Sequence, residues 1–263
     1  MNTARQESNS GLVLSIATLT AIFATLIVNI LSNFFPPGGI NIGEIANTIL
    51  QGVLITPANY AFAIWGLIYL GLIAYSIYQF SPYQRGRSTI QQVNALVILA
   101  SLAQILWVYL FTLQLFWLSV VAMLIILLPL IRTYLLLRSR RFPLSRERKW
   151  FAQIPFSIYL AWISVATIVN IASALYISGW NGWGINDSGW TAIMLIIGTV
   201  IAAIVAIQRS DFAFTLVYVW AYVAIALRHL DNPVIWITAL ASAIALLALL
   251  IFKKIRNPRQ ITT

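Results

Sequence analysis

The sequence contains no cysteine and a single histidine, His229. Without thiols the chain has no disulfide, no thiolate nucleophile and no thiolate metal ligand. One histidine is too few for a zinc or haem site built from histidines, and no Ser/His/Asp set for hydrolysis can be assembled around it. A phosphate-binding glycine loop is also missing, so the sequence does not support ATPase activity.

Charged residues are scarce as well. They make up 8% of the chain, against 61% hydrophobic residues, whereas soluble domains usually carry about 25% charged residues. None of the 6 acidic residues falls in the middle of an apolar run. This disfavours proton-coupled transport, which usually needs an intramembrane carboxylate or histidine. Enzyme activity stays open but is less expected than binding.

Eight apolar runs approach or reach the roughly 20 residues that a membrane-spanning helix needs. They cover residues 12–34, 59–80, 92–112, 115–137, 152–178, 190–208, 212–228 and 235–252. The run at 212–228 is short, so the alternative is a seven-span chain in which this segment is re-entrant. The first run is longer than the core of a signal peptide, and we expect it to be a retained helix. The predicted fold class is an all-α polytopic membrane protein.

The 16 Lys and Arg residues lie mainly between the apolar runs. This position argues against nucleic-acid binding and indicates a role in membrane topology. With eight spans, 14 of the 16 basic residues fall on the side that holds both termini, Arg132 lies near the same end of the fourth span, and only Arg228 falls on the other side. Basic loops mark the cytoplasmic side. We therefore expect an integral protein of a bacterial plasma membrane with both termini in the cytoplasm.

The loop at residues 35–56 joins the first two spans. Apolar residues recur there with helical spacing over residues 42–53 and predict an amphipathic helix of about three turns. This helix would lie either in the membrane interface or as a lid over the mouth of the helix bundle. In the lid interpretation, Ile45, Ile49 and Pro57 close the mouth.

The second span contains a row of aromatic residues. Phe62, Trp65 and Tyr69 recur at i, i+3 and i+7, which places the three rings on one helical face. The third span contributes Gln104 and Trp107. The fifth span presents an aromatic, small and amide face made of Tyr159, Trp162, Ala166 and Asn170. A buried amide either bonds two helices together or lines a cavity, and both interpretations stay open.

Taken together, these side chains predict an apolar, aromatic-lined site with a few polar groups that fix the orientation of a ligand. Its expected members are Phe62, Trp65, Tyr69, Gln104, Trp107, Tyr159, Trp162, Ala166 and Asn170. A porphyrin or a sterol would suit such a site in size and polarity. No cofactor is required, and a porphyrin or haem would be bound as a ligand.

The last three spans look plainer than the first five. Gly198, Ala202 and Ala206 form one small-residue face, and Ala241 and Ala245 form another, which indicates helix packing. Upstream, three tryptophans between residues 177 and 190 are typical of an aromatic belt, or else close a pocket mouth. The change in composition near residue 180 predicts two parts, a site-bearing domain at 1–180 and an accessory region at 181–263.

Three segments carry a family resemblance. The second span contains PANYAFAIWGLIYL, the third LAQILWVYLF and the fifth IYLAWISVATIVN. They resemble PPxWxFxxxWxxLY, LNLLWxxLFF and PYLAWVSFATLLN of the TspO/MBR family, the tryptophan-rich sensory and translocator proteins. Here Gln104 stands in place of an asparagine, Ile158 in place of a proline, and the spacing from Phe62 to Trp65 is one residue shorter. The resemblance covers residues 12–178.

The resemblance implies a five-helix bundle with a ligand pocket capped by the first loop, followed here by three additional helices. It also implies binding of porphyrins, sterols or related hydrophobic molecules, and pairing as a homodimer. The first hypothesis is therefore a membrane receptor or carrier for a hydrophobic aromatic ligand. One alternative is a structural or regulatory protein whose last three helices dock another membrane protein. A second alternative is an activity that modifies tetrapyrroles.

Overall fold

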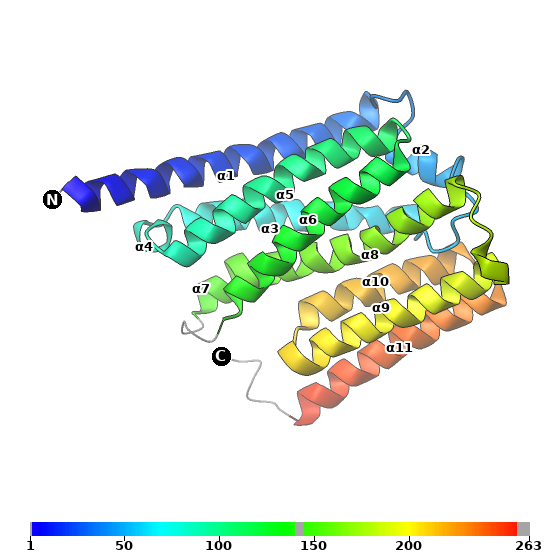
Figure 1. Cartoon of the computed structure of the whole chain (residues 1–263). Helices are drawn as coiled ribbons and strands as arrows, with labels where there is room; N and C mark the ends of the chain where they lie inside the picture. Colours follow the sequence, from blue (N-terminus) through cyan, green and yellow to red (C-terminus); the bar gives the residue numbers. More distant parts are fainter. Residues whose placement is uncertain (1, 140–144, 257–263) are drawn as a thin grey trace. The chain divides into compact units, whose positions relative to one another are not determined.

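The computed structural model describes residues 2–139 and 145–256, so Arg140, Arg141 and Arg259 of the basic segments lie outside the described residues. Each apolar run forms a helix (Figure 1). The long helices are α1 (Asn2–Phe34), α3 (Ile64–Gln79), α5 (Ser88–Thr112), α6 (Phe116–Leu137), α8 (Ile154–Ile177), α9 (Asp187–Arg209), α10 (Phe212–Arg228) and α11 (Pro233–Arg256). Short elements are α2 (Ile42–Asn47), η1 (Asn59–Ala63), α4 (Pro82–Arg85), α7 (Arg146–Arg148), η2 (Lys149–Gln153) and η3 (Gly182–Gly184).

Within the described residues, 7 helical stretches are long and apolar enough to cross a membrane. The eighth apolar helix, α10, has 17 residues and is the short one that the sequence indicates. The prediction of an all-α polytopic membrane protein is confirmed.

The chain forms two compact units. The first unit contains the residues up to Asn41 together with Trp65–Leu160, and the second contains Ile42–Ile64 together with the residues from Ala161 onward. The units therefore divide inside α3 and α8, and the loop after α1 belongs to the second unit only from Ile42 onward. The functional division expected at residue 180 stays a prediction.

In the first unit, α5 packs between α1 and α6 (Figure 1). Buried polar side chains cross-link these helices: the Thr25 hydroxyl donates to the Ser101 carbonyl at 3.2 Å. The Tyr75 hydroxyl of α3 donates to the Asn94 side chain of α5 at 2.6 Å. Such bonds satisfy polar groups that have no access to water inside a bilayer.

A π-helical turn, η2, directly precedes α8. Pro155 is the second residue of α8 and has no backbone N–H, and a π turn is a common way to absorb such an interruption. The proline also marks a close approach of α3, because a Cβ added at Gly71 would lie 2.9 Å from the Pro155 Cβ. Glycine at position 71 therefore lets the two helices touch.

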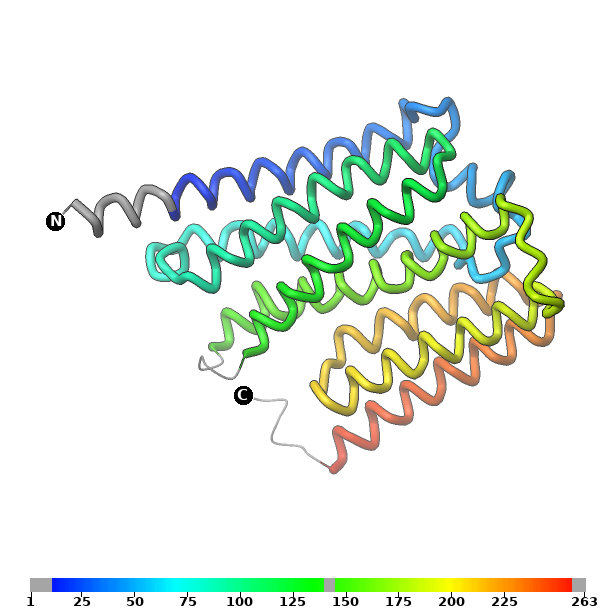
Figure 2. The backbone as a smooth tube through the Cα atoms, viewed as in Figure 1, coloured from blue at the N-terminus to red at the C-terminus, as the bar shows by residue number. Residues whose placement is uncertain are grey.

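In the second unit, α9, α10 and α11 all contact one another and follow as an up-and-down triplet (Figure 2). Ala202 and Ala206 are fully buried, as the predicted packing face of α9 requires. The predicted face on α11 is wrong, because Ala241 and Ala245 are exposed. The buried stripe of α11 lies on a different face of the helix. It contains Ala239, Ala243, Leu246 and Leu250.

The loop helix is shorter than predicted. Only α2 is helical, and residues beyond Asn47 form consecutive turns in which Leu50 N–H bonds the Ile45 carbonyl and Val53 N–H bonds the Leu50 carbonyl. Gly52 lies where a Cβ would come within 2.5 Å of the Tyr176 ring. The chain turns tightly there to pack against α8 within the second unit. This tertiary contact overrides the helix that the apolar spacing predicts.

We expect Gly198→Ala to lower thermal stability, since the added Cβ would lie 2.4 Å from the Tyr222 hydroxyl. That hydroxyl is fixed by a 2.8 Å bond to the Leu195 carbonyl, so overpacking should cost about 1–3 kcal/mol. The matched control is Gly66→Ala, where nothing lies within 4 Å of the new Cβ. A thermal melt in detergent measures both, and equal melting temperatures would contradict the packing argument.

Candidate functional site

An aromatic cluster on α3 brings together four of the predicted site residues in the first unit. The Trp65 and Tyr69 rings stack with centroids 5.7 Å apart, as residues one helical turn apart can. Trp65 also meets the Tyr159 ring edge-on at 6.1 Å. The Tyr159 hydroxyl donates to the Gln104 side-chain oxygen at 3.3 Å. We call these four residues the α3 cluster.

The Tyr69 hydroxyl is the polar group of the α3 cluster that is buried without a hydrogen bond to any described residue. The Tyr69 side chain is only 6% exposed, yet its hydroxyl is a buried polar atom without a hydrogen-bond partner among the described residues. Leaving such a group unpaired costs about 1–3 kcal/mol. The hydroxyl is therefore an unused donor and acceptor on a ring that stacks against Trp65.

Trp107 lies in an aromatic group at the turn between α5 and α6. Its ring stacks on Phe111 at 5.1 Å, and Phe111 meets Phe116 edge-on at 5.4 Å. Because Trp107 is buried, this group fastens the α5–α6 hairpin.

The second unit holds the other predicted site residues. Phe62 meets Trp162 edge-on, with centroids 5.9 Å apart. Asn170 is 2% exposed and lies one turn beyond the half-buried Ala166 on α8. These residues form a second-unit group of two aromatic rings, a small residue and an amide.

The row of three aromatic residues is only partly helical. Phe62 belongs to the 3₁₀ helix η1, and the α-helix begins at Ile64. The Phe62–Trp65 spacing, one residue shorter than in the family motif, thus spans the junction between the 3₁₀ helix and the α-helix. Trp65 and Tyr69 share one α-helical face as predicted, whereas Phe62 precedes that helix.

The sequence analysis missed an aromatic row on α10. Phe214, Tyr218 and Tyr222 recur every fourth residue, and their rings meet at 5.4 and 5.9 Å. The Tyr218 hydroxyl is 2.8 Å from the Ser164 hydroxyl of α8. The i, i+4, i+8 spacing of these aromatic residues was the signal that could have predicted the row. The last three helices therefore also contain an interacting aromatic face, which was not expected.

Residues 42–64, the loop segment, are fastened to α10. The Arg228 guanidinium donates to the Ala46 carbonyl at 3.1 Å and to the Pro57 carbonyl at 3.2 Å. The Trp220 indole donates to the Ala61 carbonyl at 3.1 Å. A guanidinium fork suits two carbonyls because its donors are fixed in one plane.

The burial of this loop bears on its two interpretations. Ile45 is fully buried, and Pro57 is buried as well, whereas Ile49 is half-buried. These apolar side chains pack into the protein, which disfavours a helix lying in the membrane interface. The role of Ile45, Ile49 and Pro57 as a lid stays a prediction.

Among the described residues, no group of three or more His, Asp or Glu side chains is placed to hold a metal ion. Aromatic faces, hydroxyls and amides make up the chemistry of the α3 cluster and of the second-unit group. Such groups suit the binding of an apolar, planar molecule.

A family model described as TSPO-like protein matches residues 15–252. The chain belongs to the TSPO-like protein family. The match runs beyond the segments that carry the motifs and includes α9 to α11, so these helices are part of the TSPO-like chain. No curated protein matches it. No solved structure matches it either.

We expect Arg228→Leu to release the loop segment, because the substitution leaves the Ala46 and Pro57 carbonyls without their donors. The loss should be about 2 kcal/mol, as for hydrogen bonds to a charged group. Hydrogen exchange of residues 42–64 measures it. Lys254→Gln, which removes an exposed charge in the same unit, is the control. Unchanged exchange in Arg228→Leu would show that the fork does not hold the loop.

A pH dependence follows from His229, next to this fork. Burial lowers the pKa of the His229 imidazole below its usual 6.5, and the Arg228 charge lowers it further, while Asp231 and a bond to the Thr56 backbone raise it. The unfolded chain then binds more protons than the folded one, so His229 stabilises the fold above about pH 6.5 and this contribution is lost as the pH falls.

The melting temperature should therefore decrease from about pH 7.5 to pH 5, and His229→Gln should reduce the decrease because glutamine does not titrate. Melts across this range check the prediction. An identical slope in the parent protein and His229→Gln would contradict it.

Proposed function

We propose that this TSPO-like chain is a membrane receptor or carrier that binds a flat hydrophobic molecule, such as a porphyrin or a sterol-like compound. The observation that supports the proposal most is the Tyr69 hydroxyl, which is buried without a partner beside the stacked Trp65 ring. A planar apolar ligand gains affinity from the aromatic area, and one polar group fixes its orientation.

The other parts of the α3 cluster fit this role. Tyr159 and Gln104 hold each other by a hydrogen bond, so the edge that Tyr159 presents to Trp65 is fixed in position. A rigid wall binds a ligand with a smaller loss of conformational entropy than mobile side chains do.

In the second unit, the Phe62–Trp162 pair and Asn170 supply the same kinds of group. We propose that they contribute to ligand binding within the second unit, with Ala166 leaving space beside the amide. The loop segment would serve as the lid through Ile45, Ile49 and Pro57. The Arg228 bonds to the Ala46 and Pro57 carbonyls hold this segment against α10.

The alternative in which α9 and α11 dock another membrane protein loses one of its two motivating features. The Gly198 face of α9 receives Tyr222 of the same chain, which leaves the exposed Ala241 and Ala245 of α11 as the remaining face.

We propose the positive-inside orientation, with both termini in the cytoplasm of a bacterial cell. The accessibility of a C-terminal tag in intact cells would check it.

The ligand proposal predicts saturable quenching of tryptophan fluorescence when purified protein is titrated with protoporphyrin IX or haem. Trp65→Ala should weaken binding by roughly tenfold or more, because it removes a large aromatic contact. Tyr69→Phe keeps the ring and should weaken binding by about threefold to tenfold through the lost hydrogen bond. Competition by a sterol tests the second ligand class.

Trp117→Phe is the control, since Trp117 is 52% exposed at the start of α6 and should leave the dissociation constant unchanged. Trp162→Ala and Asn170→Ala test the second-unit group separately. The proposal is wrong if the parent protein shows no saturable quenching. The site is wrong if Trp65→Ala and Tyr69→Phe bind as the parent protein does.

A further inference from the structure

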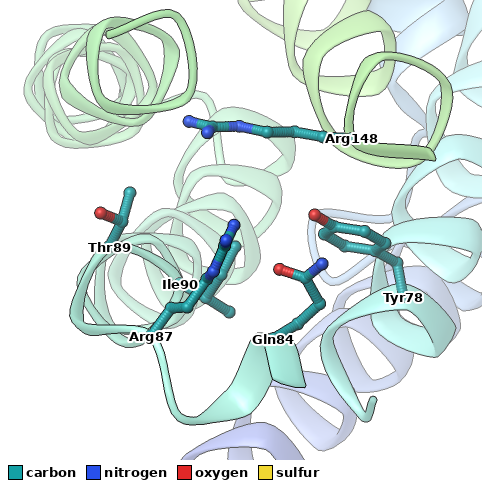
Figure 3. A pocket seen from close by; sticks show the side chains of 6 residues that line it. All are labelled: Tyr78, Gln84, Arg87, Thr89, Ile90 and Arg148. Atoms are coloured by element: carbon teal, nitrogen blue, oxygen red, sulfur yellow. The ribbon is translucent and has the colours of Figure 1, made fainter. Parts of the chain in front are cut away.

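A hollow lies in the first unit, where α5 begins. Its lining combines two arginines, a phenol, an amide, a hydroxyl and one apolar side chain (Figure 3). These residues are Tyr78, Gln84, Arg87, Thr89, Ile90 and Arg148. The enclosed part of the hollow is small, about 10 Å³, and the hollow opens to solvent, so a bound group would lie mainly at its mouth. We call it the basic hollow.

Both arginines are held in place by the fold. Arg148 is 4% exposed, and its guanidinium donates to the Leu137 carbonyl at 2.8 Å and to the Leu136 carbonyl at 3.3 Å. These carbonyls end α6, where the helix dipole favours a cation. Arg87 lies over the Tyr83 ring, 4.3 Å from its centroid, and bonds the Tyr83 hydroxyl. Arg148 is thus fixed inside the hollow, whereas Arg87 is half-buried and its partner Tyr83 is exposed.

Two buried polar atoms face the same space. Tyr78 is 8% exposed and Gln84 is 6% exposed. Among the described residues, the Tyr78 hydroxyl and the Gln84 side-chain oxygen have no hydrogen-bond partner. Figure 3 shows both side chains directed towards the arginines. A phenol can donate to an anion, and an amide can turn its NH₂ group towards one, so both gain a partner if an oxyanion enters.

The start of α5 adds to the positive potential. Arg87 occupies the N-cap position, and its side chain makes no capping bond to the first turn. The N–H groups of a first helical turn have no partner within the helix and attract anions. Glu147 is the carboxylate whose charge also acts on Tyr78. It is exposed, so the two arginines and the helix end outweigh it.

We propose that the basic hollow binds a phosphate group. Two guanidiniums, a phenol and a helix N-terminus match the several oxygens of a phosphate, and guanidinium–phosphate bonds are charge-assisted and directional. The hollow lies at the ends of the membrane-spanning helices α3 and α5, where lipid headgroups are found. The same chemistry would accept free phosphate, so the test separates these two sources.

The experiment is calorimetric titration of the purified full-length chain in an uncharged detergent. The probes are dioctanoyl phosphatidic acid, inorganic phosphate at constant ionic strength, and dioctanoyl phosphatidylcholine as the control for acyl chains. Arg87→Gln should weaken the binding of the phosphate probe about tenfold. Tyr78→Phe should weaken it about threefold to tenfold while leaving the free protein folded, since it removes a hydroxyl without a partner.

The matched control is Arg85→Gln, which removes an equal charge from the same loop outside the lining of the hollow. It should change the dissociation constant by less than about twofold, because Arg85 does not line the hollow. Site-dependent binding of phosphatidic acid alone assigns the hollow to a lipid headgroup, and site-dependent binding of inorganic phosphate alone assigns it to a soluble anion. Binding of both supports the shared chemistry.

Two results would overturn the proposal. One is the absence of saturable binding by either phosphate probe. The other is an equal loss of affinity in Arg85→Gln and Arg87→Gln with no effect of Tyr78→Phe, which would indicate general attraction to basic loops. Neither result bears on the α3 cluster, because the porphyrin titration reports on that site separately.

Discussion

A bilayer offers no water to polar groups in its hydrocarbon region, so each such group must find a partner inside the protein. Most buried polar side chains here do so. Tyr75 bonds Asn94 between α3 and α5, and Tyr222 bonds the Leu195 carbonyl between α10 and α9. Threonines bond the carbonyl one turn earlier, as Thr25 does with Ala21. Against this background, a buried group without a partner is informative.

The groups without partners differ in what they imply. Ser15 and Thr133 also have such hydroxyls, but a small hydroxyl can rotate towards a carbonyl of its own helix. A phenol at the end of a rigid ring has no such local alternative. Tyr69 and Tyr78 are therefore the stronger indicators, and each lies among side chains that suit a ligand. For Tyr69 these are aromatic rings, and for Tyr78 they are arginines.

Arg228 shows how the same constraint shapes the loop. It is a cation at the end of α10, and the bonds that define its place go to two main-chain carbonyls. The tight turns of the loop segment leave such carbonyls outside any helix, and a guanidinium satisfies two of them at once. The loop segment and α10 thus stabilise each other.

Hydrophobicity and helical period were enough to predict the helices, because a span must be long, apolar and internally bonded. They were also enough to predict that Trp65 and Tyr69, which are one turn apart, share one helical face. They failed where a tertiary contact decides the outcome. The turn at Gly52 depends on Tyr176, and the exposure of Ala241 depends on which stripe of α11 meets its neighbours. The basic hollow was missed because Arg87 and Arg148 are distant in sequence and looked like topology signals.

The two proposed sites, the α3 cluster and the basic hollow, follow each other along α3 for a physical reason. Tyr69 and Tyr78 are nine residues apart, about 14 Å at 1.5 Å per residue. An arginine near Tyr69 would have to leave water within the hydrocarbon region, at a cost of several kcal/mol. Near Tyr78 the helix ends, and Arg148 can use the carbonyls that end α6. Desolvation thus confines the charged chemistry to the end of α3 and leaves its middle to aromatic contacts, so a single ligand would have to be amphipathic to engage both.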